Sequence, residues 1–220
     1  MIDLTSLIIT FKIAIISTSI LLVITIFLAW WLSISKSYFA KIIEITCLLP
    51  LLLPPTVLGF YLLLALNKNS IIGSLAYKIF GYPLVFNQVG LVIASIIYSL
   101  PFMLQPIQNA FMKFPAQLVQ HGQALGKSNF TILLRVIIPN SVAGIISGCV
   151  LSFMHTVGEF GIALMVGGNI PNKTQLVSMK IYEEVQLANY STAHLYAIIL
   201  ISLAFASLLL LNIINKKKVV

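Results

Sequence analysis

Long apolar runs separated by short polar stretches set the pattern of this chain. Five runs are long enough to cross a bilayer, because about 20 apolar residues in a helix span roughly 30 Å of hydrocarbon. None of the runs alternates apolar and polar positions as the strands of a membrane barrel do. The pattern predicts an all-α, polytopic membrane protein with one transmembrane helix for each run. The predicted spans cover residues 13–34, 42–66, 89–111, 136–166 and 194–214.

The composition supports this interpretation. Of the 220 residues, 60% are hydrophobic and only 8% are charged, which is more apolar surface than one soluble core of this size can bury. We therefore predict a single transmembrane domain over residues 1–220 and no second domain. The first run is too long for a cleavable signal peptide and ends in Trp30 and Trp31, so we expect it to remain in the mature protein.

Basic residues predict the orientation. One face of the five-span arrangement collects Lys36, Lys41, Lys113, Lys127, Arg135, Lys216, Lys217 and Lys218. The other face holds Lys68, Lys78, Lys173 and Lys180, together with the acidic Asp3, Glu183 and Glu184. Because cytoplasmic loops carry the excess of lysine and arginine, the first face is cytoplasmic, the N-terminus lies outside and the C-terminus inside. The net charge of +8 then reflects topology and lipid headgroups, and we expect no nucleic-acid partner.

The sequence has no pattern for a metal or a nucleotide. Cys47 and Cys149 fall inside apolar runs and lack metal-ligand spacing, so we expect neither a disulfide framework nor a metal site. We also expect no cofactor. Gly126 and Lys127 look like the end of a phosphate-binding loop. Too few residues separate Gly122 from Gly126 for that loop, and no strand precedes it, so we expect that the chain does not bind ATP itself.

Residues 112–135 form the longest connection on the predicted cytoplasmic face, where a soluble partner could act. Its apolar positions predict a short amphipathic helix, a turn at Gly126 and a second helical stretch that runs into Pro139. Two short helices joined by a turn form a segment on which a soluble partner could dock. An ordinary amphipathic connector is the alternative interpretation.

The second predicted span contains Pro50, Pro54, Pro55 and Gly59. Proline frees a backbone carbonyl and kinks a helix. In a membrane this is tolerated where neighbouring helices or water satisfy the backbone, so the segment is expected to face the bundle interior or a pathway. A kink that merely improves packing is the alternative.

The fourth predicted span places His155 and Glu159 four residues apart, on one face of a continuous helix. Ionisable groups at this depth mark candidate pathways. A carboxylate that faced a transported anion would repel it, so we expect a structural role for Glu159, hydrogen-bonded to His155 or to helix-end amides. Gly158 and Gly161 would then permit close helix approach.

The loop of residues 112–135 also carries a resemblance. Its glycine, its proline and their spacing are similar to the EAA loop of binding-protein-dependent ABC importer permeases. The residues concerned are Gln120, His121, Gly122, Gln123, Ala124, Gly126 and Pro139. In that family the loop forms a coupling helix that sits in a groove of the ATPase subunit. Gln120 stands where the family has its acidic residue, so the role of that residue is not carried over.

Three longer stretches sharpen the resemblance. LPPTVLGFYLL, VGEFG and GGNIPNKTQLVSMKIYEEV resemble the molybdate-type permeases and their sulfate and tungstate relatives. This implies a type I ABC importer permease fold and a homodimer with one translocation path. Two cytoplasmic ABC ATPase subunits would hydrolyse the ATP, and an extracytoplasmic oxyanion-binding protein would dock on outer segments 71–88 and 167–193. The expected location is the cytoplasmic membrane of a prokaryote.

The expected function is therefore the channel-forming subunit of an ATP-driven molybdate importer, itself not an enzyme. A sulfate, thiosulfate or tungstate permease is the alternative within the family. A secondary transporter driven by an ion gradient is the alternative from another class, and His155 and Glu159 would then handle protons. Such transporters usually contain internal repeats, and the chain has no convincing repeat.

Overall fold

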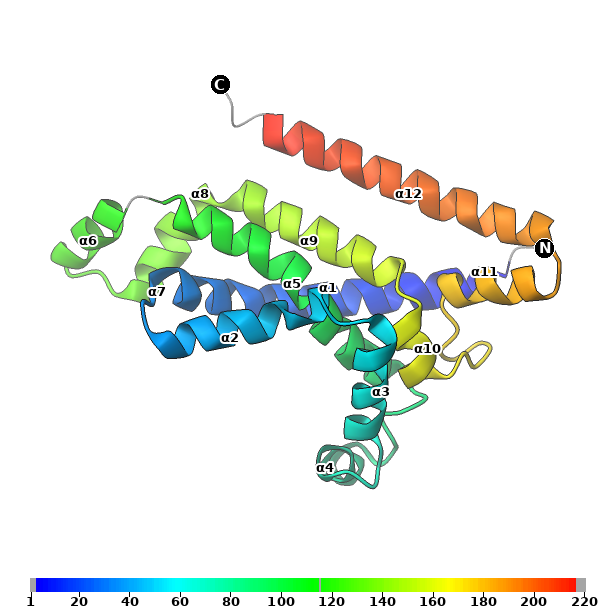
Figure 1. Ribbon diagram of the computed structural model, residues 1–220. Coiled ribbons are helices and arrows are strands. Elements are labelled where there is room, and N and C mark those ends of the chain that lie inside the picture. The colour runs from blue at the N-terminus through cyan, green and yellow to red at the C-terminus, as the bar shows by residue number, and fades with distance from the viewer. Residues whose placement is uncertain (1–2, 115, 217–220) are drawn as a thin grey trace.

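Figure 1 shows the computed structural model, which describes residues 3–114 and 116–216. Within these ranges every regular element is helical, which confirms the predicted all-α class. The elements are α1 (Leu4–Ile34), α2 (Tyr38–Leu48), η1 (Leu49–Leu51), α3 (Pro55–Leu66), α4 (Ile71–Phe80), α5 (Gln88–Met112), α6 (Ala116–Ala124), α7 (Asn129–Ile132), the π-helical turn η2 (Leu133–Ile137), α8 (Ile138–Asn140), α9 (Val142–Val157), α10 (Gly161–Gly167), α11 (Val177–Gln186) and α12 (Tyr190–Lys216).

Three of the described helices, α1, α5 and α12, are each long and apolar enough to cross a membrane. Two bent helix pairs are further candidates. α2 with η1 meets α3 at 112°, and the segment from α7 to α8 meets α9 at 77°. Counting each bent pair as one span gives five, the predicted number.

Two consecutive prolines cause the bend before α3. Pro54 is extended, with φ −56° and ψ 134°, and Pro55 is the first residue of α3. Proline lacks the N–H that a helix interior needs and disfavours helical geometry in the residue before it. The first helical position tolerates proline, so one helix stops and another begins at Pro55. The second predicted span is therefore two helices at a steep angle.

Helices α1, α5 and α9 lie side by side and form the centre of the bundle (Figure 1). Glycines on α9 allow its close contact with α5. A Cβ atom at Gly144 would lie 2.4 Å from the Cβ of Ala110, and one at Gly148 would lie 3.0 Å from the carbonyl oxygen of Met103. Side chains at these positions would push the two helices apart.

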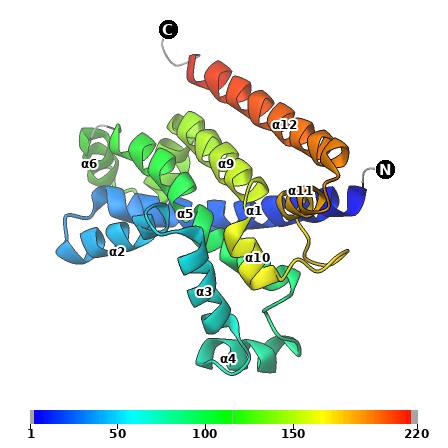
Figure 2. The same cartoon turned by 45° about the vertical axis from the view of Figure 1, so that its right-hand side comes forward.

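Helices α3 and α4 extend away from this bundle, as Figure 2 shows. Helix α10 packs against α3 and α5, whereas α12 packs against α9 and α11. Most side chains of α12 are open in the single chain, with Ile201 68% and Phe205 63% exposed. In a bilayer such apolar side chains face lipid or another helix, so their exposure in one chain is expected.

The two ends of the bundle carry different elements. Helix α6 lies at one end, and α11 lies with the start of α1 at the other (Figure 1). At the second end, Tyr196 of α12 accepts a 2.7 Å hydrogen bond from the Asp3 N–H. The pKa of Asp3 lies below its ordinary value because its carboxylate accepts the backbone N–H of Thr5. Of the basic cluster predicted on the inner face, Lys217 and Lys218 lie outside the described residues.

Candidate functional site

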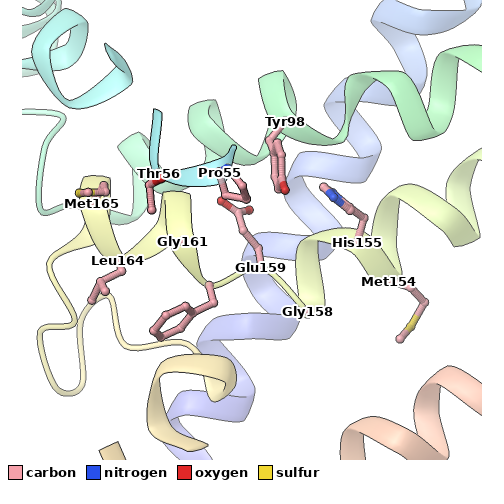
Figure 3. Close-up of a pocket in the computed structure, with 11 residues that line it drawn as sticks. Pro55, Thr56, Tyr98, Met154, His155, Gly158, Glu159, Gly161, Leu164 and Met165 are labelled. Atoms are coloured by element: carbon pink, nitrogen blue, oxygen red, sulfur yellow. The ribbon is translucent and has the colours of Figure 1, made fainter. Parts of the chain in front are cut away.

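A cavity of about 580 Å³ opens where the end of α9, the start of α10 and the start of α3 meet (Figure 3). Pro55 and Thr56 line it from α3, and Tyr98 lines it from α5. His155 and Glu159 line it from the α9 side. The structure thus brings the proline-rich second run and the ionisable pair of the fourth run to one place, which we call the central pocket.

The backbone around Glu159 is not helical. Helix α9 ends at Val157, and α10 begins only at Gly161. The Glu159 N–H still donates to the Thr156 carbonyl, at 3.3 Å, so the last turn of α9 tightens before the chain leaves it. The prediction that one continuous helix carries His155 and Glu159 on the same face was wrong, because the helix ends between them.

Glu159 is buried, with 3% of its surface exposed. Its Oε2 accepts a 2.8 Å hydrogen bond from Ser95 Oγ on α5, and its backbone oxygen accepts one from Ser178 Oγ on α11. Its Oε1 has no partner among the described residues. Figure 3 shows the Glu159 carboxyl group pointing toward Pro55. The central pocket therefore contains one carboxyl oxygen that is buried and free to bond.

His155 is held by different groups. Its ring lies between the rings of Tyr98 and Phe102, at centroid distances of 4.4 Å and 3.8 Å. A 3.0 Å hydrogen bond joins its Nδ1 to Ser99 Oγ, which is also 2.9 Å from Thr156 Oγ1. The expected hydrogen bond between Glu159 and His155 is replaced by bonds to two serines of α5. This follows from the end of α9, which separates the two side chains.

Glycines set the distance between α3 and α10 beside the central pocket. A Cβ atom at Gly59 would lie 3.1 Å from the Cα of Ile162, and one at Gly161 would lie 3.0 Å from the Cβ of Pro55. At Gly158 the nearest atom to an added Cβ would be 3.6 Å away, which is ordinary contact. The close approach therefore depends on Gly59 and Gly161 and not on Gly158.

The loop singled out in the sequence lies far along the bundle from the central pocket. Gln120, His121, Gln123 and Ala124 are exposed on α6. Gly126 follows with φ +73°, a left-handed conformation that glycine adopts without strain, and ends the helix. Pro139 is exposed on α8.

Side chains fold this loop into a compact hairpin. Gln123 Nε2 donates a 2.8 Å hydrogen bond to Asn129 Oδ1 across the turn. Gly122 faces Ile132, and an added Cβ atom there would lie 2.9 Å from Ile132 Cδ1. A glycine at this position therefore lets α6 pack directly on α7. We call residues 116–132 the helical hairpin.

Sequence reasoning missed the polar groups that hold the ionisable pair. Ser95 and Ser99 are single hydroxyls in an otherwise apolar run, and Tyr98 lies between them. Their four-residue spacing places them on one face of α5, opposite the ionisable pair of another span. A search for small hydroxyl residues at helical spacing in the neighbouring run would have found them.

Comparisons with known proteins place the chain in a family. Residues 21–220 match the model of the binding-protein-dependent transport system inner membrane component. The chain is 41% identical to the molybdenum transport system permease protein ModB of Azotobacter vinelandii, over 87% of this chain and 85% of that protein. It is 33% identical to ModB of Haemophilus influenzae, over 88% of this chain and 85% of that protein. It is also 33% identical to ModB of Escherichia coli K12, over 84% of this chain and 81% of that protein.

Solved structures show the same fold. A bacterial ABC transporter involved in the import of the acidic polysaccharide alginate matches with a TM-score of 0.72 at 18% identity, over 97% of this chain and 80% of that chain. A bacterial alginate ABC transporter in complex with an alginate pentasaccharide-bound periplasmic protein matches with a TM-score of 0.70 at 17% identity, over 96% of this chain and 79% of that chain. The chain therefore belongs to the family of binding-protein-dependent transport system inner membrane components.

Proposed function

We propose that this chain is the channel-forming permease subunit of an ATP-driven molybdate importer in the cytoplasmic membrane of a prokaryote. The observation that carries the proposal is its identity of 33% to 41% with three molybdenum permeases over most of each chain. A probable sulfate transport system permease of Chlorella vulgaris is 29% identical over 84% of this chain. The lower identity favours molybdate over sulfate.

The translocation path in this proposal passes the central pocket and is shared by two copies of the chain. A membrane path needs polar groups that lipid does not touch, and the pocket gathers hydroxyl, imidazole and carboxyl groups at the break between α9 and α10. Apolar side chains on α3 and α4 are open in one chain and offer surface to a second copy or to lipid. Ile71 is 82% exposed and Tyr61 63%.

The helical hairpin is the docking site for a cytoplasmic ATPase subunit in this proposal. It lies at the end of the bundle that the lysine and arginine count assigns to the cytoplasm. Leu125 and Phe130 expose 77% and 57% of their surfaces there, outside the predicted spans. Large apolar side chains exposed to water mark interaction sites when they gather on one surface. The hairpin thus offers an apolar contact to a soluble partner.

A chain of helices, bent by 77° before α9, joins the hairpin to the central pocket. From α7 the chain passes through η2 and α8 into α9, and α9 ends at the pocket. Closure of the ATPase pair on ATP would push on the hairpin and tilt α9, opening the pocket toward the outside. The loaded binding protein and ATP must then both prefer the outward-open state, because a ligand shifts an equilibrium only through its differential affinity.

A crosslinking experiment tests the hairpin contact. Gln123→Cys is introduced after Cys47 and Cys149 have been replaced, and the variant is mixed with a candidate ATPase subunit carrying surface cysteines. We expect a crosslink that changes in yield when ATP is added. Gln186→Cys, exposed on α11 at the other end, is the matched control and should give none. Equal crosslinking at both positions, or none at Gln123 in an active complex, would contradict the proposed contact.

A further inference from the structure

Helix α11 is firmly attached to the bundle. Leu176, Val177 and Met179 are almost fully buried at its start. The Val177 N–H donates a 2.9 Å hydrogen bond to Thr10 Oγ1 on α1. Further along the same helix, Lys180 Nζ lies 3.2 Å from Glu183 and 3.0 Å from Glu184. The buried start thus anchors α11 to the bundle, and the ion pairs within the helix stiffen it.

One face of α11 holds the connection between α9 and α10. Ser178 Oγ donates a hydrogen bond to the backbone oxygen of Glu159. One turn later, the Tyr182 ring packs against the Phe160 ring at a centroid distance of 5.1 Å. The connection that carries the pocket carboxyl group is thus held from outside the bundle by two consecutive turns of one helix.

The Ser178 bond reaches a backbone group that has no helical partner of its own. Carbonyls at the end of a helix lack the N–H groups that would follow, and Glu159 comes directly after Gly158, the C-cap of α9. The side chain of Glu159 is meanwhile bound by Ser95 on α5. Glu159 therefore joins three elements: its own connection, α5 inside the bundle and α11 at the outer end.

We propose that Ser178 is a positioning residue that couples α11 to the central pocket, so that a partner docking on the outer face moves Glu159. The proposal rests on the proposed function, which assigns the end with α11 to the outside. A shift of α11 pulls the Glu159 carbonyl with it and changes where the free Oε1 points in the pocket. Without the Ser178 hydroxyl the Tyr182–Phe160 ring contact remains, but a shift of α11 moves the Glu159 carbonyl less.

Thr10 supplies a matched control. The Thr10 Oγ1 atom, on α1, accepts a hydrogen bond from the Val177 N–H of α11 and donates one to the Ser6 carbonyl of its own helix. Thr10→Val removes both bonds, including the one to α11, in a side chain of similar shape, whereas Ser178→Ala removes the bond to Glu159. A purely structural role for both hydroxyls predicts the same outcome for the two variants. A coupling role for Ser178 predicts different outcomes.

The test measures the ATPase rate of the reconstituted complex while molybdate-loaded binding protein is titrated. For Ser178→Ala we expect the ratio of maximal to basal rate to fall severalfold, with the half-saturating concentration of binding protein unchanged. Thr10→Val should keep the wild-type ratio, and Ser178→Thr, which keeps the hydroxyl, should restore it. If Ser178→Ala does not assemble, Ser178→Cys, a weaker donor, replaces it and should lower the ratio partly.

Two results would overturn the proposal. One is a wild-type ratio in the Ser178→Ala complex, and the other is an equal fall in the Ser178→Ala and Thr10→Val complexes. Failure of the proposed function gives a different result, because the wild-type complex itself would then not respond to molybdate-loaded binding protein.

Discussion

Ser95 and Glu159 are 64 residues apart in the chain and joined by a 2.8 Å hydrogen bond from Ser95 Oγ to Glu159 Oε2. This bond ties the middle of α5 to the connection between α9 and α10. Ser95 is the hydrogen-bond partner of the Glu159 side chain among the described residues. The other carboxyl oxygen, Oε1, has no partner among them. The position of Glu159 in the central pocket therefore depends on Ser95.

Ser95→Ala is expected to destabilise the protein by about 1–3 kcal/mol, because a buried carboxyl oxygen then loses the one donor that it has among residues 3–114 and 116–216. Thermal unfolding of the purified protein in detergent measures the effect. Ser191→Ala is the matched control, since Ser191 is exposed and its hydroxyl donates to the side chain of nearby Asn189. If the two variants unfolded at the same temperature, the bond would have no role in stability.

Gly144→Ala should lower the stability of the protein, whereas Gly158→Ala should leave it nearly unchanged. At Gly144 the added Cβ atom would lie 2.4 Å from the Cβ of Ala110, so α5 and α9 must separate, and overpacking costs about 1–3 kcal/mol. At Gly158 the nearest atom would be 3.6 Å away, so alanine fits. Thermal unfolding of both variants checks this, and equal stability of the two would contradict the packing of α5 on α9.

Gly126→Ala should weaken coupling to the ATPase. The residue has φ +73°, and a left-handed conformation costs a residue with a Cβ atom about 1–2 kcal/mol. No atom lies within 4 Å of the added Cβ, so the effect is one of backbone conformation alone. Gly126→Asn is the control, because asparagine tolerates this conformation. We expect a lower ATPase rate for Gly126→Ala and a nearly wild-type rate for Gly126→Asn; the reverse order would be evidence against a left-handed turn.

Asp3 gives a prediction on pH. Its pKa is lowered in the folded protein by the Thr5 N–H, so its ionised form stabilises the start of α1. This contribution is present above the unfolded pKa of about 3.9 and is lost as pH falls through the folded pKa. Asp3→Asn keeps the cap but cannot ionise. The stability difference between wild type and Asp3→Asn should shrink as pH falls from 5 to 3, and a constant difference would contradict the assignment.

The apolar runs predicted the helices well because lipid leaves the backbone few alternatives to a helix. They could not predict where a run breaks. Pro54 and Pro55 predicted a kink in the second run, but the 112° angle depends on how α3 packs against α10. The break at Gly158 has no such signal, since glycine is common within membrane helices.

The central pocket was only partly predictable for a related reason. His155 and Glu159 stood out because ionisable residues are rare in apolar runs. Ser95 and Ser99 did not, because a single hydroxyl changes the polarity of an apolar run very little. Ser178 did not either, because it lies in the polar segment 167–193, where one more hydroxyl is not distinctive. The spacing of Ser95 and Ser99 marks a polar face of α5, but it does not say which element that face meets. The contacts of α5 and α11 with the connection between α9 and α10 are tertiary relationships.

The most direct test of the proposed function is the ATPase rate of this chain reconstituted in liposomes with its candidate ATPase subunit. The rate is measured with molybdate-loaded, tungstate-loaded, sulfate-loaded and empty binding protein. We predict that the molybdate-loaded protein stimulates the rate and that the sulfate-loaded and empty proteins do not. Equal stimulation by the sulfate-loaded protein, or no association with an ATPase subunit at all, would contradict the assignment of this chain to a molybdate importer.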